Sequence, residues 1–160
     1  IHKEYRRQRQ MCIRDSTKSI NYGRVNRAGA IILSKDKTKI VLVLNRISYM
    51  KGEYKFGLPK GHLELNEKHL PAVGAQREVL EETGIFFPVD DFKSFIKICD
   101  TLYYILTLDS NAVNKFTPHD SKEIIYTGWF DLNSVEFLNT NRTLIKAMKQ
   151  MDRIKNINSI

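Results

Sequence analysis

The stretch REVLEETGI, residues 77–85, decides the fold of this 160-residue chain. Glu78 and Glu82 are four residues apart, so in an α-helix they lie one turn apart on one face, and Glu81 joins them. Three carboxylates in one stripe repel each other. Hard divalent cations such as Mg²⁺ or Mn²⁺, or a lysine-lined partner, would offset that repulsion. A solvated acidic helix face is the other interpretation, and the glutamates alone leave both open.

The residues around this stretch define the limits of the helix that carries it. Pro71 stands where the first turn of a helix tolerates proline, and Gly84 can supply a left-handed cap after the last turn. A helix over residues 70–83 is therefore predicted.

The rest of the chain alternates apolar runs with polar turns. Loops are predicted at residues 35–38, 49–53 and 111–121, and an amphipathic helix at 141–155 closes the chain. Strands that precede and follow a helix, with a second helix at the end, predict an α+β fold or a layered α/β/α sandwich. The strands are predicted at residues 27–34, 39–46, 54–61, 92–99, 102–108 and 123–130.

Composition bounds the class of protein. Apolar residues make up 42% of the chain and charged residues 28%, which fits one globular domain. No apolar run is long enough to span a bilayer, and no secretory signal is recognisable, so we expect no membrane partner. Cys12 and Cys99, which lack metal-ligand spacing, predict a reducing, cytoplasmic compartment without a disulfide framework.

Residues 1–16 are expected to stand apart from the fold. The string RQRQMCIRDS at residues 7–16 resembles translated sequencing-adapter read-through. We interpret residues 1–16 as a non-native or disordered segment, and residues 17–160 as the folded domain.

The chain is basic, with a formal net charge of +8. Such a surface suits polyanionic partners such as nucleotides, RNA or inositol phosphates, although it can also serve solubility alone. A cationic stripe at helical spacing near the C-terminus could follow an RNA backbone, or could be a solvated helix face. The stripe consists of Arg142, Lys146, Lys149 and Arg153, and Leu144, Ile145, Met148 and Met151 are predicted to face the body of the protein.

A glycine and a glutamate upstream complete a longer motif. Together with residues 77–85, Gly61 and Glu67 resemble the box of the Nudix hydrolases, in which a glycine, a glutamate and R-E-U-x-E-E-x-G-U follow in order, U being a bulky aliphatic residue. The resemblance covers about residues 25–155. It implies a Nudix-type α/β/α sandwich with a mixed central sheet, a metal-binding helix and a C-terminal helix.

One spacing departs from the family pattern. Nine residues, not seven, separate Glu67 from Arg77, and the extra pair falls before the helix, near residues 68–71. A longer loop into the helix is expected, with the register of the helical glutamates unchanged.

The resemblance also implies roles for particular residues. Glu78, Glu81 and Glu82 would hold Mg²⁺ or Mn²⁺, with the backbone carbonyl of Lys60 completing the shell, and Arg77 would pair with Glu67. Metal ions neutralise phosphate charge and lower the pKa of bound water, and a nearby carboxylate accepts the proton. Two candidates for that base stay open: Glu78 and Glu123, the latter because KEI at residues 122–124 resembles the late strand region of the family.

The loop before the motif concerns the substrate. FGLPKGH at residues 56–62 resembles both the mRNA-decapping members and the hydrolases of diadenosine tetraphosphate or diphosphoinositol polyphosphates. Phe56, Lys60 and His62 are the candidate substrate-binding residues. The predicted activity is metal-dependent cleavage of a pyrophosphate linkage in a nucleotide or polyphosphate, with an mRNA cap placed first. A catalytically silent binding module is the alternative, against which the intact glutamate set argues.

Overall fold

The computed structural model describes residues 25–157, so the expectation for residues 1–16 lies outside the described part. Within the described residues, seven strands form a single sheet in the order β3-β2-β1-β6-β5, with β4 paired to β1 and β7 paired to β2. β1 and β6 are parallel and the other pairs are antiparallel, which confirms a mixed sheet. The strands are β1 (Arg27–Ser34), β2 (Lys39–Asn45), β3 (Phe56–Gly57), β4 (Lys60–His62), β5 (Phe95–Ile98), β6 (Thr101–Leu108) and β7 (Ile124–Asp131).

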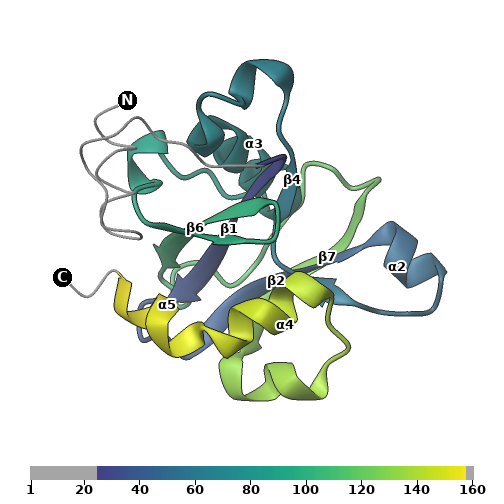
Figure 1. The fold of residues 1–160 in the computed structure, drawn as a ribbon. Helices are drawn as coiled ribbons and strands as arrows, with labels where there is room; N and C mark the ends of the chain where they lie inside the picture. Colours follow the sequence, from purple (N-terminus) through teal and green to yellow (C-terminus); the bar gives the residue numbers. More distant parts are fainter. Residues whose placement is uncertain (1–24, 158–160) are drawn as a thin grey trace.

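Helices cover both faces of this sheet (Figure 1). No helix within residues 25–157 has the length and apolar character needed to cross a membrane. The α-helices are α2 (Arg46–Met50), α3 (Pro71–Thr83), α4 (Arg142–Lys149) and α5 (Met151–Ile157), and the 3₁₀ helices are η1 (Leu65–Glu67), η2 (Val89–Asp91) and η3 (Leu132–Phe137).

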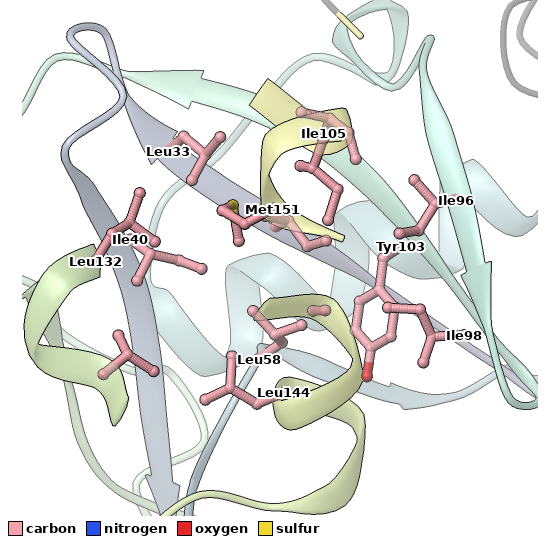
Figure 2. Packing of buried hydrophobic residues seen from close by; sticks show 14 of the residues in the cluster. Leu33, Ile40, Leu58, Ile96, Ile98, Tyr103, Ile105, Leu132, Leu144 and Met151 are labelled. Carbon is pink, nitrogen blue, oxygen red and sulfur yellow. The ribbon is translucent and has the colours of Figure 1, made fainter. Parts of the chain in front are cut away.

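The alternation of side chains along β1 divides the core in two. Ala28 and Ile32 belong to the cluster that packs under α3, whereas Ile31 and Leu33 belong to the cluster under α4 and α5. Figure 2 shows the second cluster, in which Leu144 lies against the sheet. Because successive strand residues point to opposite faces, one buried strand supplies both cores. The α/β/α sandwich is thus confirmed.

α3 begins and ends as its sequence predicts. Pro71 is its first residue, and Gly84 adopts the left-handed conformation, with φ of 76°. A side chain at Gly84 would also meet the carbonyl oxygen of Thr117. Ala72, Ala75 and Val79 are buried against the sheet. The face of α3 that carries the glutamates is turned towards β4, where the Glu78 carboxyl lies against Gly61.

Two segments before α3 differ from their predicted structures. The loop predicted at 49–53 was wrong for its first two residues, which end a short helix, α2. The start of α2 is capped by the Asn45 side chain, which accepts from the Ser48 N–H. The single strand predicted at 54–61 is two strands, because the chain leaves β2 after Gly57 and joins β1 at Lys60. Pro59 stands between them, and it cannot donate a ladder hydrogen bond.

The C-terminal helix is broken, not continuous. α4 ends at Lys149 and α5 begins at Met151, with Gln150 capping α4. Leu144, Ala147 and Met151 are buried, whereas Ile145 is 46% exposed, so the prediction that Ile145 faces the body was wrong.

The basic stripe is interrupted as well. Arg142, Lys149 and Arg153 are exposed, but Lys146 is half-buried and its Nζ donates to Cys99 Sγ at 3.2 Å. The four cations therefore do not form one uniform solvated row.

Candidate active site

A cavity of about 250 Å³ opens where β1, β2, β3 and β4 meet the end of α3 and the start of β7. Basic and acidic side chains line it. They are Arg27, Lys55, Lys60, His62, Glu82 and Glu123. Of these, Lys60, His62, Glu82 and Glu123 were predicted from the sequence as site residues. The pairing of β4 with β1 brings Lys60 and His62 to this cavity.

The cationic wall follows from the register of β1 and β4. Arg27 lies opposite His62, and Gly29 lies opposite Lys60. Directly opposed residues of an antiparallel pair share a face, as do residues two apart on one strand. Arg27, Lys60 and His62 therefore project from the same face. Gly29 allows β4 to approach β1 this closely, because a Cβ there would lie 2.1 Å from the Pro59 carbonyl oxygen and 2.6 Å from Lys60 Cβ.

The carboxylates approach from the α3 side of β4. A Cβ on Gly61 would lie 2.1 Å from the carboxyl carbon of Glu78, so the absence of a side chain at Gly61 lets the carboxylate rest against the strand. On the next turn, Glu82 Oε1 accepts a hydrogen bond from the Lys60 backbone N–H at 3.0 Å. β4 is thus bordered by carboxylates on one side and cations on the other.

Arg77 organises the loop before α3. Its Nε and Nη2 each donate to Glu67 at 2.8 Å, and Nη2 also donates to the His62 carbonyl at 3.0 Å. The Arg77 guanidinium lowers the pKa of Glu67, and the Glu67 hydrogen bond raises that of Arg77. The two-residue insertion therefore leaves the arginine–glutamate pair intact.

Arg77 also holds two of the helical glutamates. Its Nη1 donates to Glu78 Oε1 at 2.8 Å and to both oxygens of Glu81 at 3.3 Å. Glu78 is buried, whereas the side chain of Glu81 is 38% exposed. Glu81 thus reaches the cluster from its outer side.

Burial sets the protonation of the inner glutamates. Loss of solvation raises the pKa of Glu78 to about 7, although the Arg77 charge opposes this. Loss of solvation likewise raises the pKa of Glu82 to about 8, and the neighbouring charges of Glu78 and Glu123 add to the effect. A cation bound beside these two carboxyls would favour their ionised forms.

Glu123 reaches the same cavity from the loop before β7. Its N–H donates to Asp120 Oδ1 at 3.1 Å, and the Asp120 N–H donates to the Glu81 carbonyl at 2.9 Å. Burial raises the pKa of Glu123, and the charges of Asp120 and Glu81 act in the same direction. The loop is therefore tied to the end of α3 and carries Glu123 to the cavity that Glu82 lines.

The donor set suits a hard cation, but its members are engaged with protein groups. Within residues 25–157, no three acidic, histidine or cysteine side chains converge as a ready-made metal site. Glu78 and Glu81 accept from Arg77, and Glu82 accepts from the Lys60 N–H. Carboxylate oxygens are the ligands that Mg²⁺ and Mn²⁺ favour, so the residues fit the ion in kind. Binding it would require these carboxylates to turn from their present donors.

Phe56 is not among the residues that line the cavity, although its neighbours Lys55 and Gly57 are. It forms edge-to-face contacts with Phe130 and Tyr126, at centroid distances of 5.0 and 6.4 Å. Its substrate-binding role stays a prediction.

Sequence reasoning missed Arg27 and Lys55, both of which line the cavity. No local pattern marks Arg27, because its place depends on the pairing of β1 with β4. Lys55 lies just before the recognised segment 56–62, so its proximity to that segment was the available signal.

The comparisons place this arrangement in a known family. The NUDIX domain model matches residues 23–151, and the chain belongs to the NUDIX family. The curated viral protein "Putative hydrolase 111R" from Invertebrate iridescent virus 3 is 33% identical over 86 residues. That match covers 52% of this chain and about half, 50%, of the viral protein's length.

Solved structures show the same fold. An Ap4A hydrolase from C. elegans, in a binary complex, is 17% identical with a TM-score of 0.59, covering 82% of this chain and 97% of that one. The NUDIX domain of Shewanella oneidensis NrtR, complexed with ADP ribose, is 15% identical with a TM-score of 0.60, covering 82% and 88%. A NUDIX-family hydrolase from Clostridium perfringens is 18% identical with a TM-score of 0.56, covering 82% and 99%.

Proposed function

We propose that this chain is a hydrolase, dependent on Mg²⁺ or Mn²⁺, that cleaves a pyrophosphate linkage in a nucleotide or other polyphosphate. The observation that carries the proposal is the cavity itself. Buried carboxylates from α3 border one side of β4, and the side chain of Lys60 lines the other. A polyanion that brings divalent cations would meet both the cation ligands and the countercharges it needs.

Three helical glutamates would hold the cation in this proposal. Glu78, Glu81 and Glu82 would supply carboxylate oxygens, with the backbone carbonyl of Lys60 completing the shell. When bound, the cation would neutralise phosphate charge and lower the pKa of a coordinated water. Arg77 would then keep its two hydrogen bonds to Glu67, which hold the loop that carries β4 against the helix.

We assign the role of general base to Glu123 in preference to Glu78. Glu78 is one of the three helical glutamates proposed as cation ligands, whereas Glu123 lines the cavity from a separate loop. A base must reach the proton it removes, and Glu123 is placed to do so without serving as a ligand. Glu123 would take the proton of the attacking water.

The proposed substrates share a chain of phosphates. They are an mRNA cap, a dinucleoside polyphosphate or a diphosphoinositol polyphosphate. The exposed cations Arg142, Lys149 and Arg153 favour an RNA body on the cap substrate, whereas the interruption of the stripe at Lys146 favours a small molecule. The FGLPKGH segment is compatible with each.

A panel of substrates tests the proposal. Purified protein is incubated with diadenosine tetraphosphate, a cap dinucleotide, a capped RNA and a diphosphoinositol polyphosphate, each with Mg²⁺, with Mn²⁺ or with EDTA. Cleavage of at least one compound with either cation, abolished by EDTA, is expected, and product masses identify the bond. Binding without cleavage of every compound would instead make the chain a binding module.

Gly61→Ala should separate catalysis from folding. The new Cβ would lie 2.1 Å from the Glu78 carboxyl, which is the far end of a flexible side chain, so the carboxylate would move and the fold would persist. We expect turnover to fall by about tenfold or more, as for a displaced metal ligand or its support. The melting temperature should change little. If the folded Gly61→Ala variant kept wild-type turnover, a role for Glu78 in the reaction would be excluded.

A further inference from the structure

Arg27 is a charged residue in the cavity to which the proposed chemistry gives no task. It is the first residue of β1, and its side chain is 39% exposed. Asp100, at the turn between β5 and β6, lies near it, with Arg27 Nη1 and Asp100 Oδ1 3.7 Å apart. An ion pair this long and this exposed stabilises the fold little. Its position is better explained by what it presents to the cavity.

The face from which Arg27 projects separates it from the proposed cation ligands. Arg27, Lys60 and His62 share one face of the β1–β4 ladder, and Gly61 turns the opposite face towards Glu78. The carboxylates and the cationic side chains therefore contact different parts of one bound molecule. Divalent cations at the glutamates would meet the phosphates of the bond being cleaved, which leaves Arg27 for a phosphate beyond them.

The placement of the cationic side chains favours a long phosphate chain. A diphosphate bridge between two nucleosides has no phosphate beyond the pair that the cations at the glutamates would hold. Arg27 and Lys60 project from the opposite face of the β1–β4 ladder, so such a bridge would leave them without a phosphate to bind. A triphosphate or tetraphosphate bridge has the additional phosphate, and a guanidinium can bind its oxygens with two parallel hydrogen bonds.

We infer that Arg27, together with Lys60, forms a phosphate subsite that selects substrates with three or more consecutive phosphates over diphosphate diesters. The inference rests on the proposed function for the identity of the reaction, but not for the binding of the anion. The weak ion pair with Asp100 leaves the guanidinium able to bind a phosphate. Arg27 is thus a specificity-determining residue, and mRNA caps and dinucleoside polyphosphates fall within the selected class.

Kinetics on two nucleotide substrates test the selection. Arg27→Gln removes the charge and keeps a long polar side chain. For diadenosine tetraphosphate, kcat/KM should fall roughly tenfold or more, the usual loss for a charge-assisted hydrogen bond. For ADP-ribose, kcat/KM should change by less than about twofold. Equal losses on both substrates, or no loss on the tetraphosphate, would overturn the subsite.

The chain offers a matched control. Lys35 and Asp109, which directly follow β1 and β6, also form a long ion pair, at 3.9 Å, but Lys35 does not line the cavity. Lys35→Gln should leave both substrates unaffected. A loss on the tetraphosphate as large as that of Arg27→Gln would show that net charge, and not the subsite, controls the rate, and would count against the inference.

A binding measurement separates this inference from the proposed function. Calorimetry of metal-free protein with inorganic tripolyphosphate and with pyrophosphate needs no turnover. Wild-type protein should bind tripolyphosphate more tightly, and Arg27→Gln should abolish that preference. If the protein hydrolyses nothing but shows this pattern, the proposed function fails and the subsite stands. Equal affinity of wild-type protein for both anions, or no detectable binding, overturns the subsite.

Discussion

Turnover should fall roughly 100-fold to 1,000-fold in Glu82→Gln, because charge stabilisation by a bound metal is worth several kcal/mol. Glutamine keeps the size of the side chain and can still accept from the Lys60 N–H, but it lacks the negative charge. Glu81→Gln should act in the same direction. Steady-state rates over a range of Mg²⁺ concentrations give the result, with Glu136→Gln on the exposed surface of η3 as the control. Near wild-type turnover in Glu81→Gln and Glu82→Gln alike would exclude the proposed metal site.

The thermal stability of Glu82→Gln tests whether its loss of turnover comes from a loss of folding. Burial raises the pKa of Glu82 to about 8 from its ordinary value of 4.5, so the folded protein holds this proton more tightly than the unfolded chain. Without metal, the wild-type protein therefore loses stability as the pH rises from about 4.5 towards about 8. Glu82→Gln escapes this loss, and with EDTA it should melt above the wild type near pH 8 and nearer to it at acidic pH.

Gly29→Ala should destabilise the fold by about 1–3 kcal/mol or more, the usual range for an overpacked core. The added Cβ would lie 2.1 Å from the Pro59 carbonyl oxygen, which is backbone and cannot rotate away. β4 would have to leave β1, and Lys60 would move with it. Urea unfolding followed by circular dichroism measures the change in the free energy of unfolding.

Gly128→Ala in β7 provides the comparison for that experiment. Its Cβ would meet the hydroxyl end of Tyr126 at 2.4 Å, and this residue is 47% exposed and can turn outward by giving up its edge-to-face contacts with Phe56 and Phe130. Its destabilisation should be clearly smaller than that of Gly29→Ala. If the two alanine variants lost equal stability, the difference in strand propensity between glycine and alanine would explain the result, and the close approach of β4 to β1 would not.

Local rules were sufficient to predict α3 from the sequence. Its start at Pro71, its left-handed end at Gly84 and the shared face of its glutamates depend on residues within a few positions of one another. The pairing of Arg77 with Glu67 followed from the family motif despite the insertion. The α/β/α layering followed from the order of apolar segments.

What could not be predicted depends on pairing between distant segments. Whether residues 54–61 form one strand or two is decided by their transfer from β2 to β1, which no local propensity encodes. Arg27 enters the cavity for the same reason. The C-terminal helix breaks at Gln150, and the exposure of Ile145 depends on which face of α4 meets the sheet. The periodicity of the apolar residues alone predicted a single helix at residues 141–155, with Ile145 on its buried face.

The hydrogen bonds at the end of α3 have a consequence for local unfolding. The last carbonyls of a helix lack partners within it, and here Glu81 receives the Asp120 N–H and Glu82 receives the Thr127 hydroxyl. The loop before β7 cannot detach without leaving the Glu81 carbonyl without its donor, and the end of the helix cannot fray without releasing that loop and its bond to Thr127 in β7. The end of α3 and the segment that bears Glu123 therefore form one cooperative unit of opening. When this unit opens, the site loses the glutamates at the end of α3 and Glu123 at the same time.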